Sequence, residues 1–545
     1  MFDNKNLLYQ PVTKTGPTNS NAFLQEATMV TNLTLSDKGG LKYATSSNDF
    51  VDQFNNISNY RSIRSYQDIE KDAYLLYTQD KELALRFTMY LRAITRKPQD
   101  IEGNTYETLR GAEMRHEAIT RMMWLAMYDR EVFLKNLPLF VMVGSWKDVM
   151  VMLRRDLMAN GWEDRKLPWN EIGELLVLGL NLPTTTNLVR KYLPTIKSKS
   201  NTNATPAAQA NVAIGKWICS LLFGSKQSGN TYRQYRKLKS AGTGHTWQQV
   251  ISRKEWDRLN FDTIHGRALR NLVKSKFLQN QGLSDRYDNW VGEKDTVKYT
   301  GFVHELFRHS GPFRRSVVSG NVDTINKQFL ELVRKGGDTE TTELIVVRDT
   351  SGSMRQAASG ETMSCGNIAK AIALYFSYFL KGHFSNNWIE FNRDAYMHEW
   401  VGSTPVEKWN NDHSGYIGTT NFQSVVDLFV RLKLQGVPES DFPKGILCIS
   451  DSEFDPSSLS ETNVQTVRRK LSQAGFSEEY CNNFIIVLWN LGCNYRTETS
   501  STATNTFYFS GYSASTMGLL TSEIKNAEQL FHAAMYQEAL NLVTV

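Results

Sequence analysis

Acidic and hydroxyl side chains alternate at the end of a short apolar run in the second half of the chain. The run starts at Leu344 and ends in Asp349, Ser351 and Ser353, with Gly352 between the two serines. An apolar, β-branched run of this kind predicts a strand buried in a parallel sheet, whose next loop lies at the ligand-binding carboxyl edge. The three oxygen-bearing side chains could face one hard cation there, with Gly352 allowing a tight turn.

Two later segments supply further oxygen ligands. Thr420 precedes an amphipathic stretch at 422–434, and Asp451 follows a second buried apolar run at 445–450. Two carboxylates and three hydroxyls suit magnesium or another divalent cation, with waters completing the shell. The first motif alone is more often a helix N-cap after a strand. All three elements in this order favour the metal site over the cap.

These residues resemble the metal-ion-dependent adhesion site of the von Willebrand factor A domain. The resemblance covers residues 349–353, Thr420 and Asp451, within residues 340–545, and Ser452 stands where many members have glycine. It implies that the metal performs no hydrolysis. It also implies that one coordination position stays open for an acidic side chain of a protein partner.

Length and composition set the class of protein. With 545 residues, 41% of them hydrophobic and 22% charged, the chain is too long for one core and is typical of a globular protein with several domains. No run approaches the ~18 apolar residues that span a bilayer, and the first residues lack the pattern of a signal peptide. The five cysteines form no C-x-x-C pair. We therefore expect a cytoplasmic protein with reduced thiols and no membrane partner.

Charge is divided unevenly along the chain, whose formal net charge is +6. Lys and Arg exceed Asp and Glu by 13 in residues 1–340, whereas the acids exceed the bases by 7 in residues 341–545. An acidic carboxyl-terminal part suits cation binding, and a basic amino-terminal part suits a polyanion such as RNA. Many soluble proteins carry an equal excess of basic residues, so charge alone leaves both alternatives open.

Hydrophobic periodicity predicts a helical region after a flexible amino-terminal arm. The arm comprises residues 1–38, which start with many Asn, Thr, Pro and Gly residues. In residues 39–335, apolar side chains at spacings of three and four predict consecutive helices without strands, which favours an α-solenoid. The expected helices are 65–77, 81–96, 112–128, 131–143, 146–160, 171–180, 207–223, 246–259, 266–281 and 298–309.

Residues 340–545 alternate strand and helix patterns, which predicts a doubly wound α/β domain. Residues 336–339 form the expected linker before it. The predicted fold class is therefore α plus α/β. The expected strands are 344–347, 388–391, 446–450, 484–489 and 507–510, and the expected helices are 367–380, 422–434, 464–474 and 522–540.

Several short segments of the helical region resemble sequence motifs of the TROVE domain of Ro autoantigen-like proteins, including uncharacterised plant, fungal and phage relatives. The resemblance implies a ring of HEAT-like helical pairs closed by a von Willebrand factor A domain. It also implies binding of single-stranded ends of structured or misfolded RNA in the hole, and of small structured RNAs on a basic outer face. The segments are 40–44, 91–96, 144–148, 190–194 and 232–237.

Basic and aromatic residues of the helical region are the candidate RNA contacts. Tyrosines interleaved with cations at 232–239 can grip a phosphate backbone and stack on bases. If 266–281 is helical, three of its cations share a face that can follow phosphates, with a solvated helix face as the equal alternative. For Lys42, Tyr43 and Lys147, only the resemblance to the TROVE domain implies contact with RNA. The full set is Lys42, Tyr43, Lys147, Tyr232, Arg233, Tyr235, Arg236, Lys237, Lys239, Arg267, Arg270 and Lys274.

The sequence does not predict an enzyme. A phosphatase with an aspartate nucleophile needs a second acid two residues after Asp349, where this chain has Ser351. The chain has no P-loop, H-E-x-x-H or G-x-S-x-G motif. We therefore expect a monomeric RNA-binding ribonucleoprotein component with a magnesium-dependent adhesion site. The alternative is a protein-interaction or virion-associated structural protein, packaged in or attached to a virion, that keeps the fold without RNA binding.

Overall fold

The structure is a computed structural model that describes residues 33–35, 41–57, 64–196, 205–224, 228–241, 247–264, 266–307, 321–336, 344–358, 361, 363–380, 384–415, 418–452, 454–457, 461–492, 500–512, 518–520 and 524–545. Most of the predicted amino-terminal arm lies outside the described residues, as do residues 337–339 of the predicted linker.

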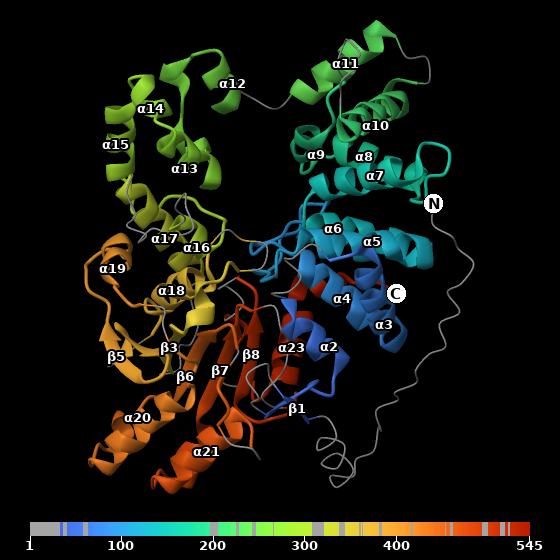
Figure 1. Cartoon of the computed structure of the whole chain (residues 1–545). Coiled ribbons are helices and arrows are strands. Elements are labelled where there is room, and N and C mark those ends of the chain that lie inside the picture. Colours follow the sequence, from blue (N-terminus) through green and yellow to red (C-terminus); the bar gives the residue numbers. More distant parts are fainter. Residues whose placement is uncertain are drawn as a thin grey trace.

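A six-stranded sheet forms the carboxyl-terminal part, in the order β5-β4-β3-β6-β7-β8 (Figure 1). Five strands run parallel, and β5 pairs antiparallel with β4 at one edge. The expected α/β architecture is confirmed as a mixed sheet that follows a helical region. The strands are β3 (Leu344–Asp349), β4 (Asn387–Phe391), β5 (Ala395–Glu399), β6 (Gly445–Ser450), β7 (Ile485–Asn490) and β8 (Thr506–Ser510).

The prediction missed β5 because this edge strand exposes most of its side chains. Tyr396 and Met397 are both exposed, so the strand carries no continuous apolar run. The central strands β3 and β6 are instead buried along their whole length. Continuous burial of parallel strands is why their sequences read as apolar runs.

Helices cover both faces of the sheet. On one face, Ile345, Val347 and Ile446 pack with α20 (Gln423–Leu434) and α21 (Asn463–Gln473). On the other face, the core continues through α18 (Cys365–Phe376) and α23 (Ala527–Met535) into the amino-terminal helices. The sheet and much of the helical region therefore share one hydrophobic core.

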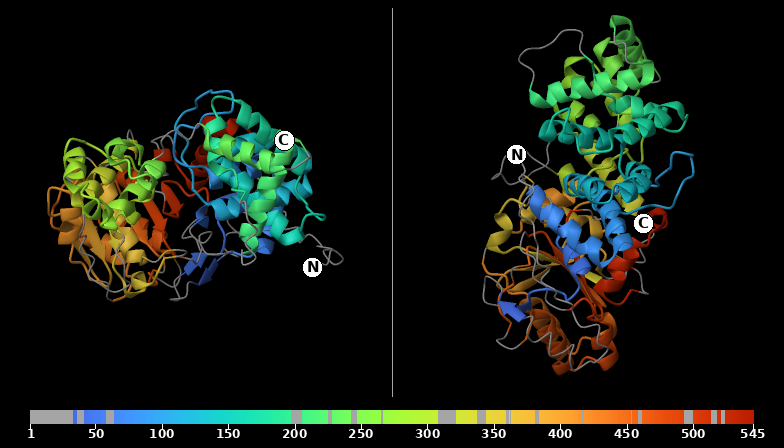
Figure 2. Two further views of the ribbon diagram at one scale, coloured as in Figure 1. Left: turned by 90° about the horizontal axis from the view of Figure 1, so that it is seen from above. Right: turned by 90° about the vertical axis from the view of Figure 1, so that its right-hand side faces the viewer.

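The helical region rises from the sheet as two arms (Figures 1 and 2). One arm contains α3 to α11, and the other contains α12 to α15 around a separate small core that includes Leu259, Leu269 and Tyr287. The helices are α2 (Asp49–Asn55), α3 (Tyr66–Gln79), α4 (Lys81–Arg92), α5 (Arg115–Tyr128), α6 (Arg130–Val143), α7 (Trp146–Asn160), α8 (Trp169–Asn181), α9 (Thr186–Tyr192), α10 (Pro206–Phe223), α11 (Gly229–Ser240), α12 (Trp247–Ser252), α13 (Gly266–Lys274), α14 (Phe277–Asn280), α15 (Ser284–Gly292), α16 (Val303–Leu306) and α17 (Val322–Gly336).

Local chemistry explains where the helices begin and end. Helix α7 has the predicted bounds because Ser145 and Asp148 form a capping box at its start. Helix α4 ends at Arg92, before the expected 96, ahead of Pro98. The expected helix 266–281 is divided into α13 and α14 at Lys276, whose φ is +57°. A left-handed residue cannot continue an α-helix.

Two short strands that the sequence analysis did not predict precede helix α2. Residues 33–35 form β1 (Leu33–Leu35), which pairs antiparallel with β2 (Leu41–Tyr43). Three-residue strands carry too little periodicity to be recognised in a sequence. The two strands are called the β1–β2 hairpin.

The carboxyl-terminal segment joins the sheet to the first helices. Asn136 on α6 accepts a hydrogen bond from the amide of Thr544 and donates one to its carbonyl oxygen. Arg86 on α4 donates to Asn541 and lies over the ring of Tyr536, 4.4 Å from its centre. Figure 1 shows this end of the chain beside α3 to α5. None of the helices in the described ranges is long and apolar enough to cross a membrane.

Candidate functional site

The candidate metal ligands lie where the order of the strands reverses. The chain runs from β3 outward through β4 and β5, and then returns to β6 on the other side of β3. Ligands of open α/β sheets bind in the crevice outside the carboxyl ends of such neighbouring strands. Asp349 is the last residue of β3, and Asp451 directly follows β6. The fold therefore brings the two predicted acids to one crevice.

Asp349 is buried and hydrogen-bonded. Its side chain has no solvent exposure; Oδ1 accepts the amide of Ser351 at 2.8 Å and Oδ2 accepts the hydroxyl of Ser450 at 2.5 Å. Burial and the negative charge of Asp451 raise the pKa of Asp349 above its ordinary value, although these hydrogen bonds oppose the rise. A buried carboxylate that is affected by the charge of a second carboxylate is a suitable place for a cation.

The predicted hydroxyl ligands lie on two loops that touch. Ser351 Oγ is 3.1 Å from Ser353 Oγ, so both hydroxyls of the first loop lie together. The amide of Gly352 donates to the carbonyl oxygen of Gly418 at 3.4 Å, which places the Thr420 loop against the first loop. Thr420 is completely buried. The structure thus gathers the elements that carry all five predicted ligands.

The loop after β6 takes a strained conformation. Ser452 has φ +64°, in the left-handed region that favours glycine. Its amide donates to Ser450 Oγ at 2.9 Å, and the amide of Asp455 donates to the carbonyl oxygen of Thr420 at 2.8 Å. These bonds hold the turn although serine stands where the resembling family often has glycine.

A set of polar contacts that the sequence analysis missed supports the first loop. Thr350 Oγ1 donates to Glu390 Oε1 at 2.8 Å, and Glu390 Oε2 is 2.7 Å from Nε2 of His398. Asn392 Nδ2 donates to Thr350 Oγ1 at 3.1 Å. These partners come from β4, β5 and the turn between them. No spacing in the sequence indicates such a contact, because strand pairing alone creates it.

A buried ionic network lies beside the same loop. Arg348 Nη1 contacts Asp412 Oδ2 at 2.6 Å, and Lys370 Nζ lies 3.4 Å from that oxygen. Burial alone would raise the pKa of Asp412, but the charges of Arg348 and Lys370 hold it well below its ordinary value. Burial lowers the pKa of Lys370 to about 8. The network fixes the segment that leads toward Thr420.

Clusters of three or more His, Cys, Asp or Glu side chains that could hold a metal ion are absent from the described residues. The predicted set differs from such a cluster because it has only two acids, Asp349 and Asp451, and takes its other oxygens from hydroxyls. Hard cations such as magnesium accept such mixed oxygen ligands and keep several waters.

The tyrosine-rich segment forms α11, and it only partly meets the prediction for RNA contact. Tyr235 is completely buried, and its hydroxyl donates to the carbonyl oxygen of Pro194 at 2.9 Å, so its ring cannot stack on a base. The prediction for Tyr235 is wrong because the helix turns this ring into the core. Tyr232 is half-buried against the core, and Lys239 donates to Thr195 Oγ1 at 2.6 Å. The cations that face solvent are Arg233, Arg236 and Lys237.

The other predicted RNA contacts have different surroundings. Arg267 on α13 pairs with Glu305, its Nε donating at 2.8 Å to Oε2, so its charge is already matched within the protein. Arg270 is half-buried, whereas the side chain of Lys274 lies outside the described residues. Leu269 of the same helix lies in the core.

Lys42 and Tyr43 lie next to each other on β2. Lys42 is only 2% exposed, and its ammonium donates to the carbonyl oxygen of Ser452 in the loop after β6. Tyr43 is half-buried. The prediction that Lys42 contacts RNA is therefore wrong in this conformation, because the hairpin directs its charge into the protein.

Lys147 belongs to a cluster of cations on α5 and α7. Partial burial and the charges of Arg115 and Arg154 lower its pKa. Arg155 lies on the same helix, and its Nη2 is 2.9 Å from Nδ1 of His116. Asp148 is the acid that pairs with Arg115, at 2.8 Å. The sequence analysis missed the arginines because only the packing of α5 on α7 brings them to Lys147.

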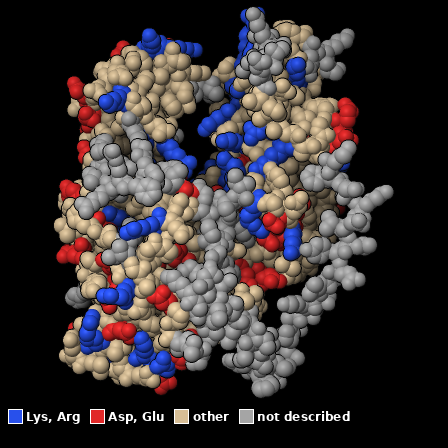
Figure 3. Space-filling view, viewed as in Figure 1, with Lys and Arg blue, Asp and Glu red and all other residues tan. Residues whose placement is uncertain are grey.

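The space-filling view shows Lys and Arg side chains along the hollow between the two arms (Figure 3). The lysine- and arginine-rich faces of one arm turn toward this hollow, whereas acidic side chains gather mainly on outer surfaces in this view. A groove with positive walls attracts polyanions.

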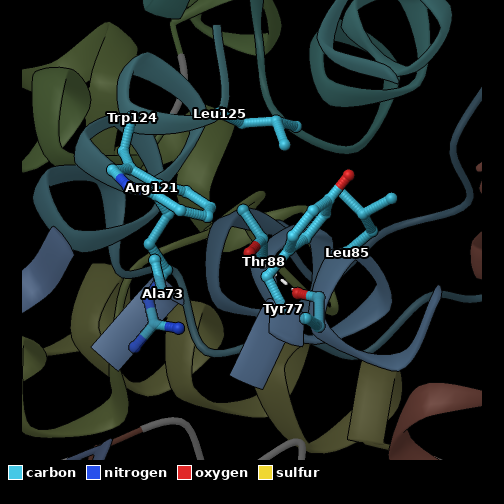
Figure 4. A pocket seen from close by; sticks show the side chains of 8 residues that line it. Ala73, Tyr77, Leu85, Thr88, Arg121, Trp124 and Leu125 are labelled. Atoms are coloured by element: carbon cyan, nitrogen blue, oxygen red, sulfur yellow. Dashed lines mark hydrogen bonds between the residues drawn. The ribbon is translucent and has the colours of Figure 1, made fainter. Parts of the chain in front are cut away.

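Two cavities lie elsewhere. The first is enclosed by α3, α4 and α5 and lined by residues such as Tyr77, Arg121 and Trp124 (Figure 4). Its volume of about 10 Å³ leaves room for no more than a water molecule. The second, of about 470 Å³, lies at the amino-terminal ends of β6 to β8 and is lined in part by Phe442 and Phe507. Neither cavity includes a predicted site residue.

Comparison with known proteins places one part of the chain. Residues 343–539 match the sequence model of a family described as a domain of unknown function (DUF7788). The match begins directly before β3 and extends past α23, so it covers the whole six-stranded sheet and its helices. No curated protein matches the chain. The carboxyl-terminal part, with Asp349, Thr420 and Asp451, is thus similar to a family whose function is undefined.

Proposed function

We propose that the crevice between β3 and β6 is a divalent-cation-dependent adhesion site within an RNA-binding ribonucleoprotein component. The observation that carries the metal site is the placement of two buried carboxylates, Asp349 and Asp451, at the reversal of strand order. Burial and the negative charge of Asp451 raise the pKa of Asp349, and a bound cation would favour its ionised form.

The residues present fit magnesium or another divalent cation. Asp349, Ser351, Ser353, Thr420 and Asp451 would hold it, and the bound ion would supply positive charge for the acidic side chain of a protein partner. The mixed six-stranded sheet is compatible with the von Willebrand factor A domain that the motif resembles. We assign binding rather than catalysis because Ser351 occupies the position where an aspartate-nucleophile phosphatase needs its second acid.

The basic cluster of the helical region supports RNA as the second partner. Arg115, Lys147, Arg154 and Arg155 lie together on α5 and α7, and Arg236 is exposed on α11 of the same arm. Clustered cations bind phosphates and release counterions. The two helical arms around a hollow are compatible with a TROVE-like arrangement, and we propose a monomeric cytoplasmic protein.

The metal site is tested by cation binding to the full chain. We expect calorimetric titration with Mg²⁺ or Mn²⁺ to show one site that Asp349→Asn abolishes, because the variant removes one carboxylate charge and keeps the shape. The variant Asp441→Asn, which removes an exposed carboxylate distant from the crevice, serves as control. Equal binding by wild type and the Asp349 variant would contradict the site.

RNA binding is tested separately. We expect tight binding of a structured RNA with a single-stranded 3′ tail, weaker binding of the same RNA with a blunt end, and a steep loss of affinity as salt rises. No binding at low or high salt would favour the alternative of a protein-interaction or virion-associated structural role. That alternative has structural support, because Lys42, Tyr235 and Arg267 are engaged within the protein.

A further inference from the structure

The β1–β2 hairpin carries a buried positive charge to the loop of the candidate metal site. Lys42 on β2 donates from its ammonium to the carbonyl oxygen of Ser452, 410 positions away in the chain. The ammonium also lies 5.7 Å from the centre of the Phe454 ring. The side chain is 2% exposed. Lysines are almost never buried to this degree unless negative charge compensates them.

The contact of Lys42 lies next to an acid of the candidate metal site in the sequence. Ser452, which accepts the ammonium, directly follows Asp451, and Asp451 interacts electrostatically with Asp349. The positive charge of Lys42 therefore contacts the residue that directly follows one of the two acids that would hold a divalent cation. Two cations that share the same acids repel each other, and this repulsion is strong in a buried site.

Other bonds hold the shape of the loop after β6. The amide of Ser452 donates to Ser450 Oγ at 2.9 Å, and the amide of Asp455 donates to the carbonyl oxygen of Thr420 at 2.8 Å. Neither bond involves Lys42. Removing the ammonium should thus change the charge at the crevice more than the position of Asp451.

We propose that Lys42 is a tethered internal cation that opposes the divalent cation at the Asp349–Asp451 crevice. This inference rests on the proposed metal site and adds its regulation. With the hairpin docked, Lys42 lowers the affinity for the divalent cation. By reciprocity, a bound divalent cation weakens the docking of the hairpin. The Lys42 contact of β2 is then autoinhibitory, and its release strengthens cation binding.

The test compares cation affinity among four forms of the full chain by calorimetric titration with Mn²⁺. Lys42→Met keeps an apolar stem against Phe454 and removes the charge, whereas Lys42→Arg keeps the charge. Lys71→Met removes one positive charge from an exposed position on α3 and is the matched control. We expect Lys42→Met to bind about tenfold more tightly than wild type, and the other two variants to stay within about twofold.

Hydrogen exchange of wild type gives an independent readout that needs no variant. Saturating Mn²⁺ should increase amide exchange in residues 41–47, because the bound ion weakens the Lys42 contact. If Lys42→Met fails to fold, unchanged or slower exchange in this segment overturns the proposal by itself.

The outcomes separate the two levels of inference. Affinity of Lys42→Met equal to or weaker than that of Lys71→Met overturns the role of Lys42 and leaves the metal site intact. Absence of Mn²⁺ binding by all four proteins overturns the metal site and, with it, this inference.

Discussion

Arg348, whose side chain is completely buried, forms an ion pair with Asp412 directly beside the candidate site. Arg348 Nη1 and Asp412 Oδ2 are 2.6 Å apart, and the arginine lies over the ring of Trp388, 3.9 Å from its centre. Arg348 directly precedes Asp349 on β3, and Asp412 begins the segment that leads to Thr420. One ion pair therefore ties together the two loops that would supply metal ligands.

Asp412→Asn should destabilise the protein by about 3–5 kcal/mol at neutral pH, because it leaves the buried Arg348 without its charged partner. The double variant Arg348→Met with Asp412→Asn should lose less than the sum of the single variants. Urea unfolding measures the free energy of unfolding of each single variant and of the double variant. If the losses of stability in the two single variants add up to the loss in the double variant, the two residues are not coupled.

The same ion pair predicts how the free energy of unfolding falls at acidic pH. The pKa of Asp412 is lower in the folded than in the unfolded protein, so its contribution to stability is complete above the unfolded pKa of about 3.9. The contribution falls as pH drops below that value toward the folded pKa. Urea unfolding between about pH 5 and pH 3 should thus show a steeper loss for wild type than for Asp412→Asn. Parallel curves would contradict this assignment.

The sequence predicts those parts of the fold that depend on local pattern. Strands β3 and β6 are recognised because burial on both faces gives continuous apolar runs, and α7 is recognised because Ser145 caps it. The acids of the site follow from those strands, since parallel strands deliver their next residues to one edge. The candidate site could therefore be predicted down to the loops that form it.

Contacts between distant segments could not be predicted in this way. Lys42 belongs to a three-residue strand, and its contact with Ser452 depends on how the hairpin docks on the sheet. Tyr235 directly precedes the exposed Arg236, and only packing against Pro194 directs its ring inward. Two adjacent residues of a helix can lie on opposite sides, one buried and one exposed. A segment that mixes basic and aromatic residues does not indicate which of them is buried.

Tyr235→Phe should reduce stability by about 1–2 kcal/mol and leave RNA affinity unchanged. The variant removes the hydroxyl that satisfies the buried carbonyl oxygen of Pro194, and the phenyl ring keeps the packing. Arg236→Met, at an exposed position of the same helix, should show the opposite pattern. Urea unfolding and filter binding of RNA measure the two effects. A loss of RNA affinity in Tyr235→Phe without loss of stability would restore the stacking prediction.

Asn136→Ala should destabilise the junction between α6 and the carboxyl-terminal segment by about 2 kcal/mol. The side chain is completely buried and both accepts from and donates to the backbone of Thr544. Glu131→Ala changes a highly exposed residue of the same helix, whose partner is Lys135, and should stay within about 0.5 kcal/mol of wild type. Thermal unfolding compares the variants. Equal stability of the two would show that the junction contributes nothing.

Neutralising the basic cluster should weaken RNA binding in a salt-dependent way. Lys147→Met, Arg154→Met and Arg155→Met each remove one cation from α7, and each loss of a phosphate contact should lower the slope of log affinity against log salt by about 1. Lys71→Met removes equal charge from α3 and should leave the slope unchanged. RNA titrations at several salt concentrations measure the slopes. If all four variants match wild type, RNA phosphates do not contact this cluster, because released counterions would otherwise appear in the slope.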